Sequence, residues 1–348
     1  MSDNAAEALV GQLLKNRWKV IKKIDPPPGS TGGFFSVCYI VEDEDGQAFL
    51  KALDFKAFFA MFPGRSVIEI IQEQSNAFQY EKELLHRCRN RNLSKVSTIL
   101  DEGEAYIAGF IIPNVPFLVF EMADGDIRSQ IDFTIKLHYA WKLRSLHNVA
   151  VGISQLHSVK IGHQDLKPSN ILLYDNKATS KIGDLGRSLC NDILAPHENG
   201  NFPGDFNYAP PEFWYNERIA EWDMRIKTTD LYLFGSLIVF YFTGLSMTTL
   251  LMKHLPLVFR PDTWGGNYNT VLPHLIDAYS RAIIELKASV GDTEVTDDIV
   301  KIVEYCCHPE FAKRGHPKTL SETNNKFDLA RIVTLLDIYA RKAEIKLL

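Results

Sequence analysis

The spacing of apolar residues predicts that the first third of the chain is rich in strands. Apolar and polar residues alternate in WKVIKKI (18–24), and FFSVCYIVED (34–43) is rich in β-branched and aromatic side chains. Turn residues at 26–33 and 44–46 frame the second segment and lead into QAFLKALDF (47–55). This pattern predicts β-hairpins, and PFLVFEM (116–122) reads as a further strand.

A helical period replaces this alternation elsewhere. Residues from about 66 to 91 place their apolar side chains near one face, at Ile68, Ile71, Phe78, Leu84 and Leu85. From Lys136 onward the pattern is mostly helical, and a last helix over 327–347 is expected to pack on that part. The strand-rich and helical parts meet near 123–125.

One uncharged stretch, Leu231 to Met252, is long enough to cross a membrane. It contains Gly235, Ser236 and Gly244 and begins directly after Asp230. A wholly buried central helix therefore fits it better than a membrane span.

Composition removes several classes of protein. With 348 residues, 46% of them hydrophobic, the chain can bury a large core. A net charge of -5 argues against a nucleic-acid binder. Five cysteines in so long a chain do not make a disulfide framework, which favours a reducing, cytoplasmic location. The N-terminus has no basic start followed by an apolar core, so it is not a signal peptide.

The stretch IGHQDLKPSNILLYD (161–175) gathers several polar side chains between a predicted helix and a short apolar strand. Asp165 could accept a proton from an attacking hydroxyl, and Lys167 could neutralise charge on a moving phosphoryl group. Asn170 offers a carbonyl oxygen to a divalent cation, and Asp184 in KIGDLG could supply a second oxygen. This chemistry suits phosphoryl transfer.

Together His163, Asp165, Lys167, Asn170 and Asp184–Leu185–Gly186 resemble the catalytic and metal-binding loops of eukaryotic-like (Hanks-type) serine/threonine protein kinases. The resemblance covers roughly 18–340. It implies an α+β, two-lobed fold, with a small antiparallel sheet and one regulatory helix in the first lobe and a larger helical second lobe. The implied divisions are an N-terminal extension (1–17), an N-lobe (18–122) and a C-lobe (123–345) of a single catalytic domain. A stand-alone bacterial or mobile-element member is expected.

The resemblance also assigns residues upstream of the loop. Lys51 would grip the nucleotide phosphates and pair with Glu81 of the regulatory helix. The remaining ATP-binding residues that it implies are Gly32, Gly33, Val37, Phe120, Glu121, Ala123, Asp126 and Leu172. Downstream, it implies that Glu212 pairs with Arg314 and that Asp230 holds the catalytic loop, with His163 as further support.

Five positions depart from the family pattern. Ser30 and Phe35 stand where glycines are expected, and Phe49 stands where the family has a small residue over the adenine. Gln164 replaces an arginine that clamps a phosphate in many members, so we expect activity without phosphorylation of the segment from Asp184 to Glu212. Asp205 occupies the place of a threonine and could pair with Lys167.

The sequence therefore predicts an ATP- and Mg²⁺- (or Mn²⁺-) dependent kinase acting on Ser or Thr of proteins, including itself. It predicts no nucleic-acid partner, no membrane contact, and a monomer or weak dimer. Two alternatives stay open: a pseudokinase that binds nucleotide as a scaffold, and a small-molecule kinase similar to the aminoglycoside phosphotransferases.

Overall fold

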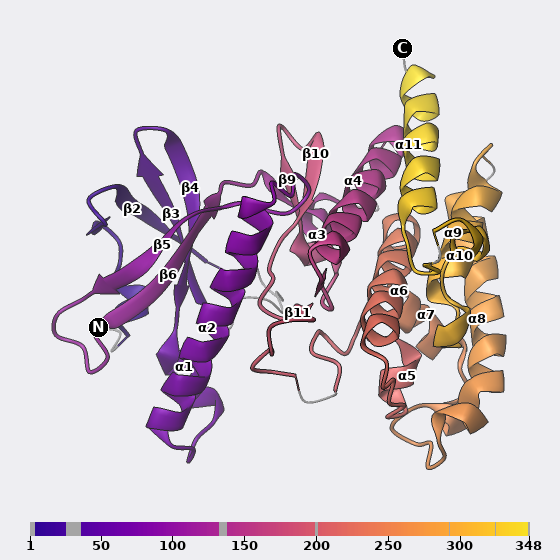
Figure 1. The fold of residues 1–348 in the computed structure, drawn as a ribbon, viewed down its shortest axis with the longest axis horizontal. Helices are drawn as coiled ribbons and strands as arrows, with labels where there is room; N and C mark the ends of the chain where they lie inside the picture. The colour runs from indigo at the N-terminus through magenta and orange to yellow at the C-terminus, as the bar shows by residue number, and fades with distance from the viewer. Residues whose placement is uncertain are drawn as a thin grey trace. The chain divides into compact units, whose positions relative to one another are not determined.

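A computed structural model describes residues 4–25, 36–131, 138–198, 201–291, 293–323 and 325–346. The chain divides into two compact units. Unit 1 comprises 1–92 and 97–124, and unit 2 comprises 93–96 and 125–348. The first unit is rich in strands and the second in helices, as the apolar pattern predicts (Figure 1).

Unit 1 is built on one antiparallel sheet of six strands in the order β1-β2-β3-β4-β6-β5. The strands are β1 (Leu13–Leu14), β2 (Trp18–Ile24), β3 (Ser36–Asp43), β4 (Gly46–Leu53), β5 (Ile99–Tyr106) and β6 (Asn114–Glu121). Two helices accompany the sheet, α1 (Phe55–Met61) and α2 (Val67–Asn90), and α2 contacts β5 (Figure 1). The short helix α1 and the strand β5 are elements that the pattern did not predict.

The core of unit 1 lies on one face of this sheet. Alternate residues of the central strands are buried there, including Tyr39, Leu50 and Phe117. The described part of the expected N-terminal extension joins the same core, because Leu9 is fully buried and Ala6 O accepts a bond of 2.5 Å from the hydroxyl of Tyr39. These residues therefore complete the core of the sheet.

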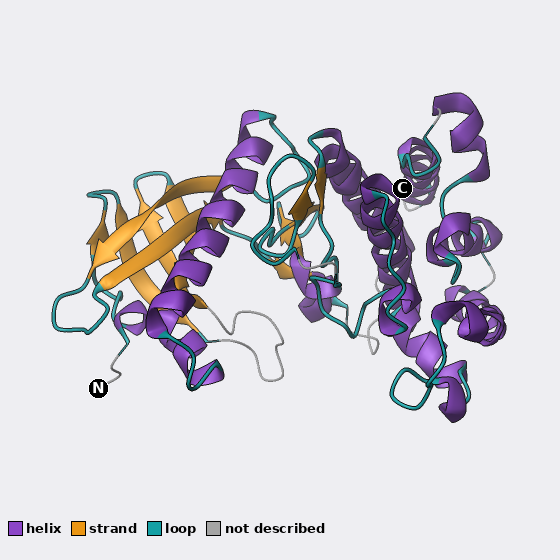
Figure 2. Ribbon diagram, turned by 60° about the horizontal axis from the view of Figure 1, so that its bottom comes forward, coloured by secondary structure: helices purple, strands orange, loops and turns teal. Residues whose placement is uncertain are grey.

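Unit 2 is mainly helical, as Figure 2 shows. Its α-helices are α3 (Ile127–Gln130), α4 (Tyr139–Ser158), α5 (Pro211–Trp214), α6 (Trp222–Thr243), α7 (Met247–His254), α8 (Tyr268–Val290), α9 (Thr296–Cys307), α10 (Pro317–Thr323) and α11 (Ala330–Ile345). Its short strands are β7 (Gly125–Asp126), β8 (Ile161–Gly162), β9 (Ile171–Tyr174), β10 (Thr179–Ile182) and β11 (Leu189–Cys190).

The uncharged stretch forms the buried centre of unit 2. Most of α6 is buried, and Gly235 lets α9 approach closely, because a Cβ there would lie 2.6 Å from the Cβ of Cys306. Gly244, in the left-handed conformation, ends α6. Among the described helices no single one is long and apolar enough to cross a bilayer, although α6 and α7, bent by 79°, pass that test as a pair.

The last helix packs on unit 2, as the sequence predicts. The guanidinium of Arg144 in α4 lies 2.8 Å from Asp337 and 2.8 Å from Glu344, both in α11. Apolar positions of α11, among them Ile332 and Leu336, are fully buried. The helix begins at Ala330, slightly later than expected.

Candidate active site

The polar stretch of unit 2 folds around the carboxylate of Asp165. Lys167 Nζ lies 3.0 Å from Asp165 Oδ2, and their side chains are 10% and 8% exposed. Asn170 Nδ2 donates to the backbone oxygen of Asp165 at 2.8 Å and to its Oδ2 at 3.1 Å. The backbone N–H of Asp205 donates to Asp165 Oδ1 at 2.8 Å. The three predicted residues are thus brought together.

Two opposing effects act on this carboxylate. Burial raises the pKa of Asp165, since it disfavours the charged form. The ammonium of Lys167 and the N–H of Asp205 act in the other direction, but the net pKa is raised. Nearby Asp184 adds to the rise. A raised pKa makes Asp165 a stronger base than an exposed aspartate.

A fully buried carboxylate, Asp230 of α6, holds the loop from the backbone side. Its Oδ2 accepts the N–H of His163 at 3.0 Å, and its Oδ1 accepts the N–H of Gln164 at 2.8 Å. His157 Nε2 lies 2.7 Å from Asp230 Oδ2. The buried ring of His163 contacts the oxygen of Gly183 at 3.0 Å and the N–H of Asp165 at 3.3 Å. This network fixes the backbone that carries Asp165.

The side chain of Gln164 also bonds to Asp230. Its side-chain Nε2 donates to Asp230 Oδ1 at 2.8 Å and to the oxygen of Ile226 at 3.0 Å, and the residue is 1% exposed. Its backbone has a φ of 62°, which is uncommon for a residue with a side chain. The amide is therefore turned into unit 2 and takes part in holding the loop.

Asn170 and Asp184, whose side-chain oxygens were predicted to bind a metal ion, lie close to each other in unit 2. The N–H of Gly183 donates to the backbone oxygen of Asn170 at 2.8 Å, which brings the next residue, Asp184, beside the catalytic loop. Asp184 is exposed and has a φ of 58°. No three His, Cys, Asp or Glu side chains of the described ranges gather into a metal cluster.

Two further predicted residues of unit 2 are strand partners. Asp126 of β7 pairs with Leu172 of β9, and Leu172 is partly exposed. The carboxylate of Asp126 also caps α3, accepting the N–H of Ser129 at 2.7 Å. One oxygen of the Asp126 carboxylate is therefore already used by the fold.

In unit 1, Lys51 and Glu81 form an ion pair. Lys51 Nζ lies 2.9 Å from Glu81 Oε1 and 3.3 Å from Oε2. Glu81 is buried on α2 and Lys51 stands on β4. Strand and helix are therefore linked by a partly buried pair.

The face of β4 that carries Lys51 also carries Phe49. Phe49 is the cross-strand partner of Phe120, and their ring centroids lie 6.4 Å apart. Across β3 the partner of Lys51 is Cys38. Val37 pairs with Ala52 and belongs to the opposite, core-facing set, where it is 7% exposed, so its expected part in ATP binding stays a prediction.

The contacts of the other residues predicted to bind ATP in unit 1 do not test that prediction. Glu121 ends β6, and its Oε1 accepts the N–H of Thr98 at 2.8 Å. Ala123 is partly exposed. Gly32 and Gly33 lie outside the described residues.

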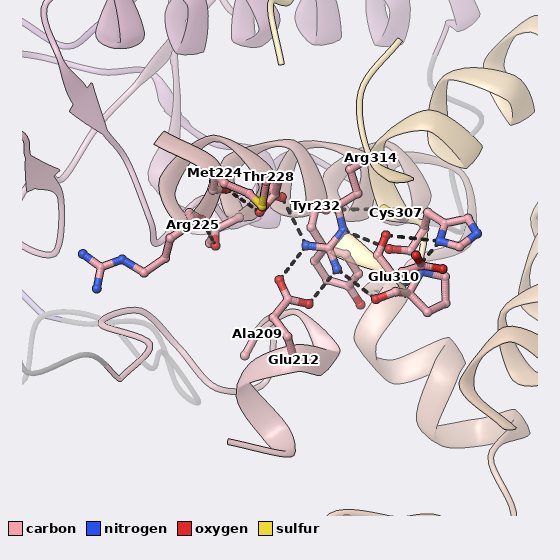
Figure 3. A network of polar contacts seen from close by, with 12 residues as sticks. Ala209, Glu212, Met224, Arg225, Thr228, Tyr232, Cys307, Glu310 and Arg314 are labelled. Atoms are coloured by element: carbon pink, nitrogen blue, oxygen red, sulfur yellow. Dashed lines mark hydrogen bonds and ion pairs between the residues drawn. The ribbon is translucent and has the colours of Figure 1, made fainter. Parts of the chain in front are cut away.

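Glu212 and Arg314 form a fully buried, two-pronged ion pair (Figure 3). Both terminal nitrogens of Arg314 lie 2.7 Å from the two oxygens of Glu212. Burial acts to lower the pKa of Arg314, but the charge and hydrogen bonds of Glu212 outweigh it, and the net pKa is raised. Tyr232 of α6 lies under the guanidinium, at 4.8 Å. The pair fastens α5 to the segment after α9.

The segment between Asp184 and Glu212 has two contacts that the sequence did not reveal. Glu198 lies 2.5 Å from Arg225 of α6, and each side chain is 17% exposed. Gly204 passes so close to the catalytic loop that a Cβ would contact the oxygen of Gln164 and lie 2.9 Å from Asp165 Oδ1. Only the glycine in GDFNYAPPE hinted at this approach.

Comparison with known families decides the relationship. A family model described as the protein kinase domain matches residues 66–323. The chain belongs to the protein kinase family. The α+β fold, with an antiparallel-sheet lobe and a helical lobe, is thereby confirmed.

Curated relatives agree with this family. The chain is 27% identical over 214 residues to an inhibitor of nuclear factor kappa-B kinase subunit alpha from Xenopus tropicalis, covering 60% of this chain and 25% of that protein. It is 25% identical over 283 residues to a probable L-type lectin-domain containing receptor kinase from Arabidopsis thaliana, covering 76% and 40%. A calmodulin-binding receptor-like cytoplasmic kinase of the same plant is 28% identical over 222 residues, covering 62% and 40%. The kinase chain thus spans between a quarter and two fifths of these relatives' length.

Proposed function

We propose that this kinase chain transfers the γ-phosphoryl group of ATP to Ser or Thr hydroxyls of proteins, including its own. The observation that carries the proposal is the buried cluster of Asp165, Lys167 and Asn170. Family membership supports phosphoryl transfer in general. The Ser/Thr preference rests on Lys167, on the resemblance of DLKPSN, and on the name of one similar plant protein, a probable receptor-like serine/threonine-protein kinase.

Each residue of the cluster has a distinct part in the proposed reaction. Asp165 would accept the proton of the substrate hydroxyl, and its raised pKa suits that part. Lys167, fixed beside it, would stabilise negative charge on the transferred group. In unit 1, Lys51 would bind nucleotide phosphates, with its ammonium held by Glu81.

The donors at the loop fit a magnesium ion shared with a nucleotide. Asn170 uses its Nδ2 for Asp165, and within the described residues its Oδ1 accepts no hydrogen bond. Asp184 adds a carboxylate. Magnesium in such sites takes one or two protein oxygens and completes its shell with phosphate oxygens and water. When bound, ATP would supply the transferable phosphoryl group, and Mg²⁺ or Mn²⁺ would neutralise its charge.

We further infer that the kinase does not need phosphorylation of its Asp184–Glu212 segment. Ser188 is fully buried, with its Oγ 3.3 Å from the oxygen of His163, and Gln164 is turned toward Asp230. The other hydroxyl of the segment is Tyr208. A rate that required phosphate at Ser188 or Tyr208, located by mass spectrometry, would contradict this inference.

The test is an incubation of the purified protein with γ-labelled ATP and Mg²⁺ beside Asp165→Asn, with a generic acceptor protein present. Label on protein Ser or Thr from the wild type, and none from the variant, is the expected result. Label on tyrosine would remove the Ser/Thr assignment. Label on small hydroxyl compounds alone would favour a small-molecule kinase.

A nucleotide-binding scaffold is the second candidate, and one observation favours it. Phe49 and Phe120 place two large rings on the face of Lys51, where they would narrow an adenine site. ATP binding measured by calorimetry, with no transfer by the wild type, would establish the scaffold.

We also propose a cytoplasmic location, because all five cysteines are free thiols, which suits a reducing compartment. The monomer or weak dimer likewise remains a proposal.

A further inference from the structure

A cavity of unit 2 lies beside the elements that support the loop carrying Asp165. It has a volume of about 180 Å³ and is lined by the end of α4, β8, the residue after β11 and the first turns of α6. That volume corresponds to roughly six water molecules and is below the range of about 300–1,000 Å³ typical of drug-sized ligands. Asp165, Lys167, Asn170 and Asp184 are not among its lining residues. We call it the α4–α6 cavity.

The lining of this cavity offers more donors than acceptors. Lys160 is exposed, and its ammonium has no ion pair or hydrogen bond to any described residue. The indole N–H of Trp222 and the side-chain amide of Asn191 also lack a partner among the residues that the structure describes. Asp223, the one lining carboxylate, is neutralised by Lys227 at 2.7 Å. The uncompensated charge is therefore positive.

The main chain holds Lys160 in an unusual conformation at this place. Its φ is 62°, and bulky residues with side chains seldom adopt that region. The N–H of Lys160 donates to His157 O at 3.1 Å, and its own oxygen accepts the N–H of Asn191 at 3.1 Å. These bonds fix the backbones of Lys160 and Asn191 next to each other before any ligand arrives, so that only their side chains must be ordered on binding.

We propose that the α4–α6 cavity is a binding site for a phosphate group. Lys160 supplies the charge, while the Trp222 indole and the Asn191 amide supply hydrogen-bond donors. Ile161 and Ile226, both 1% exposed, form an apolar floor that weakens competition from water. The group is free phosphate or the head of a small phosphate ester, since the volume admits little more.

The position of the cavity gives an occupant a short route to the catalytic loop. His157 lines the cavity and lies 2.7 Å from Asp230 Oδ2. Asp230 in turn accepts the N–H groups of His163 and Gln164. One side chain therefore separates the ligand from the carboxylate that holds the loop.

The test uses the full chain without ATP, so its outcome does not depend on the proposed kinase activity. The indole N–H signals of the five tryptophans are recorded by NMR, and the Trp222 signal is assigned with Trp222→Phe. Inorganic phosphate is then titrated against chloride at constant ionic strength. We expect a saturable shift of the Trp222 signal, and roughly tenfold weaker binding in Lys160→Gln. Lys301→Gln on α9, another exposed lysine with no ion pair or hydrogen bond to a described residue, is the matched control and should bind like the wild type.

Two further titrations identify the ligand. Phenyl phosphate that binds more tightly than inorganic phosphate indicates an ester, and equal affinity indicates free phosphate. The proposal is overturned if the Trp222 signal does not move, if Lys160→Gln binds as tightly as the wild type, or if acetate saturates the site equally well. Should Lys160→Gln fail to fold, Asn191→Ala on the exposed rim tests the same donors.

Discussion

At the scale of single residues, Asp165 is held in place at a cost. Its carboxylate receives Lys167, Asn170 and the N–H of Asp205, which fixes its orientation. Burial nevertheless raises its pKa, so the ionised form that could accept a proton is disfavoured in the folded chain. Function and stability therefore pull this residue in opposite directions.

Replacing Asp165 by Asn should separate the effect of this residue on the reaction rate from its effect on stability. The amide keeps the shape and an accepting oxygen but cannot take a proton, so phosphoryl transfer should fall by roughly 10²- to 10⁴-fold. The melting temperature should change little, because the gain from removing a buried carboxylate is offset by loss of the ion pair with Lys167. Calorimetry beside the rate measurement checks this, and a clear fall in melting temperature would mean that Asp165 is chiefly structural.

The free energy of unfolding and the reaction rate should change in opposite directions with pH. Above the ordinary aspartate pKa and up to the raised one, the folded chain keeps a proton on Asp165 that the unfolded chain has released. This group's contribution to the free energy of unfolding therefore falls as pH rises through that window, while the rate rises. Denaturation and rate profiles of the wild type and Asp165→Asn check both signs. A stability contribution that rises with pH would contradict the raised pKa.

Substitution of Gly204 should lower the rate of phosphoryl transfer about as much as substitution of the residues proposed to catalyse it. Gly204→Ala brings a Cβ against Gln164 O and within 2.9 Å of Asp165 Oδ1, so the carboxylate must move. Misplacement of about 1 Å can cost roughly 10²-fold in rate. Steady-state rates compared with Gly265→Ala, where a Cβ meets nothing within 4 Å, provide the check. Equal rates of the two variants would show that the segment can retreat without disturbing Asp165.

At the scale of elements, the segment from Asp184 to Glu212 is fastened to α6 by a carboxylate of its own. Glu198 pairs with Arg225 at 2.5 Å, and both side chains are mostly buried. A pair of this kind contributes about 1 kcal/mol, or roughly fivefold in an equilibrium. Glu198→Arg should therefore expose the segment to limited proteolysis about fivefold faster. Combining it with Arg225→Glu should restore resistance, and failure of the reversed pair to do so would remove the ion pair as the cause.

The second fastening, Glu212 with Arg314, should matter more because neither partner reaches water. Glu212→Ala leaves a buried guanidinium uncompensated and should lower the free energy of unfolding by about 3–5 kcal/mol. Urea denaturation measures the loss. Glu44→Ala, in an exposed turn, should change the same quantity by less than about 0.5 kcal/mol. Similar losses in both variants would indicate that Arg314 finds other partners.

At the scale of the whole molecule, features close together in sequence were the predictable ones. The loop from His163 to Asn170 and the buried helix α6 follow from composition and period, because their chemistry lies within a few turns of chain. The Glu198–Arg225 pair and the close approach of Gly204 depend on how distant segments meet, and no local pattern encodes that meeting. Strand β5 was missed because its sequence, ILDEGEAY, carries three carboxylates and a glycine.

The register of β3 against β4 was another feature that the sequence could not predict. The pairing of β3 with β4 places Cys38, and not Val37, across from Lys51. A shift of one residue moves every side chain of a strand to the other face. Hydrophobicity alone could not decide this, since Val37 and Cys38 are both apolar.

The tight packing of Gly235 against α9 buries two thiols, whose alkylation can therefore report on unfolding of unit 2. Cys306 and Cys307 are fully buried there, and burial raises the pKa of both thiols, that of Cys306 to about 12. An alkylating reagent at neutral pH meets neither a thiolate nor an open path. Cys38 in unit 1 is only half-buried. The order in which these thiols become labelled would therefore time the opening of each unit in the same molecule, without any added probe.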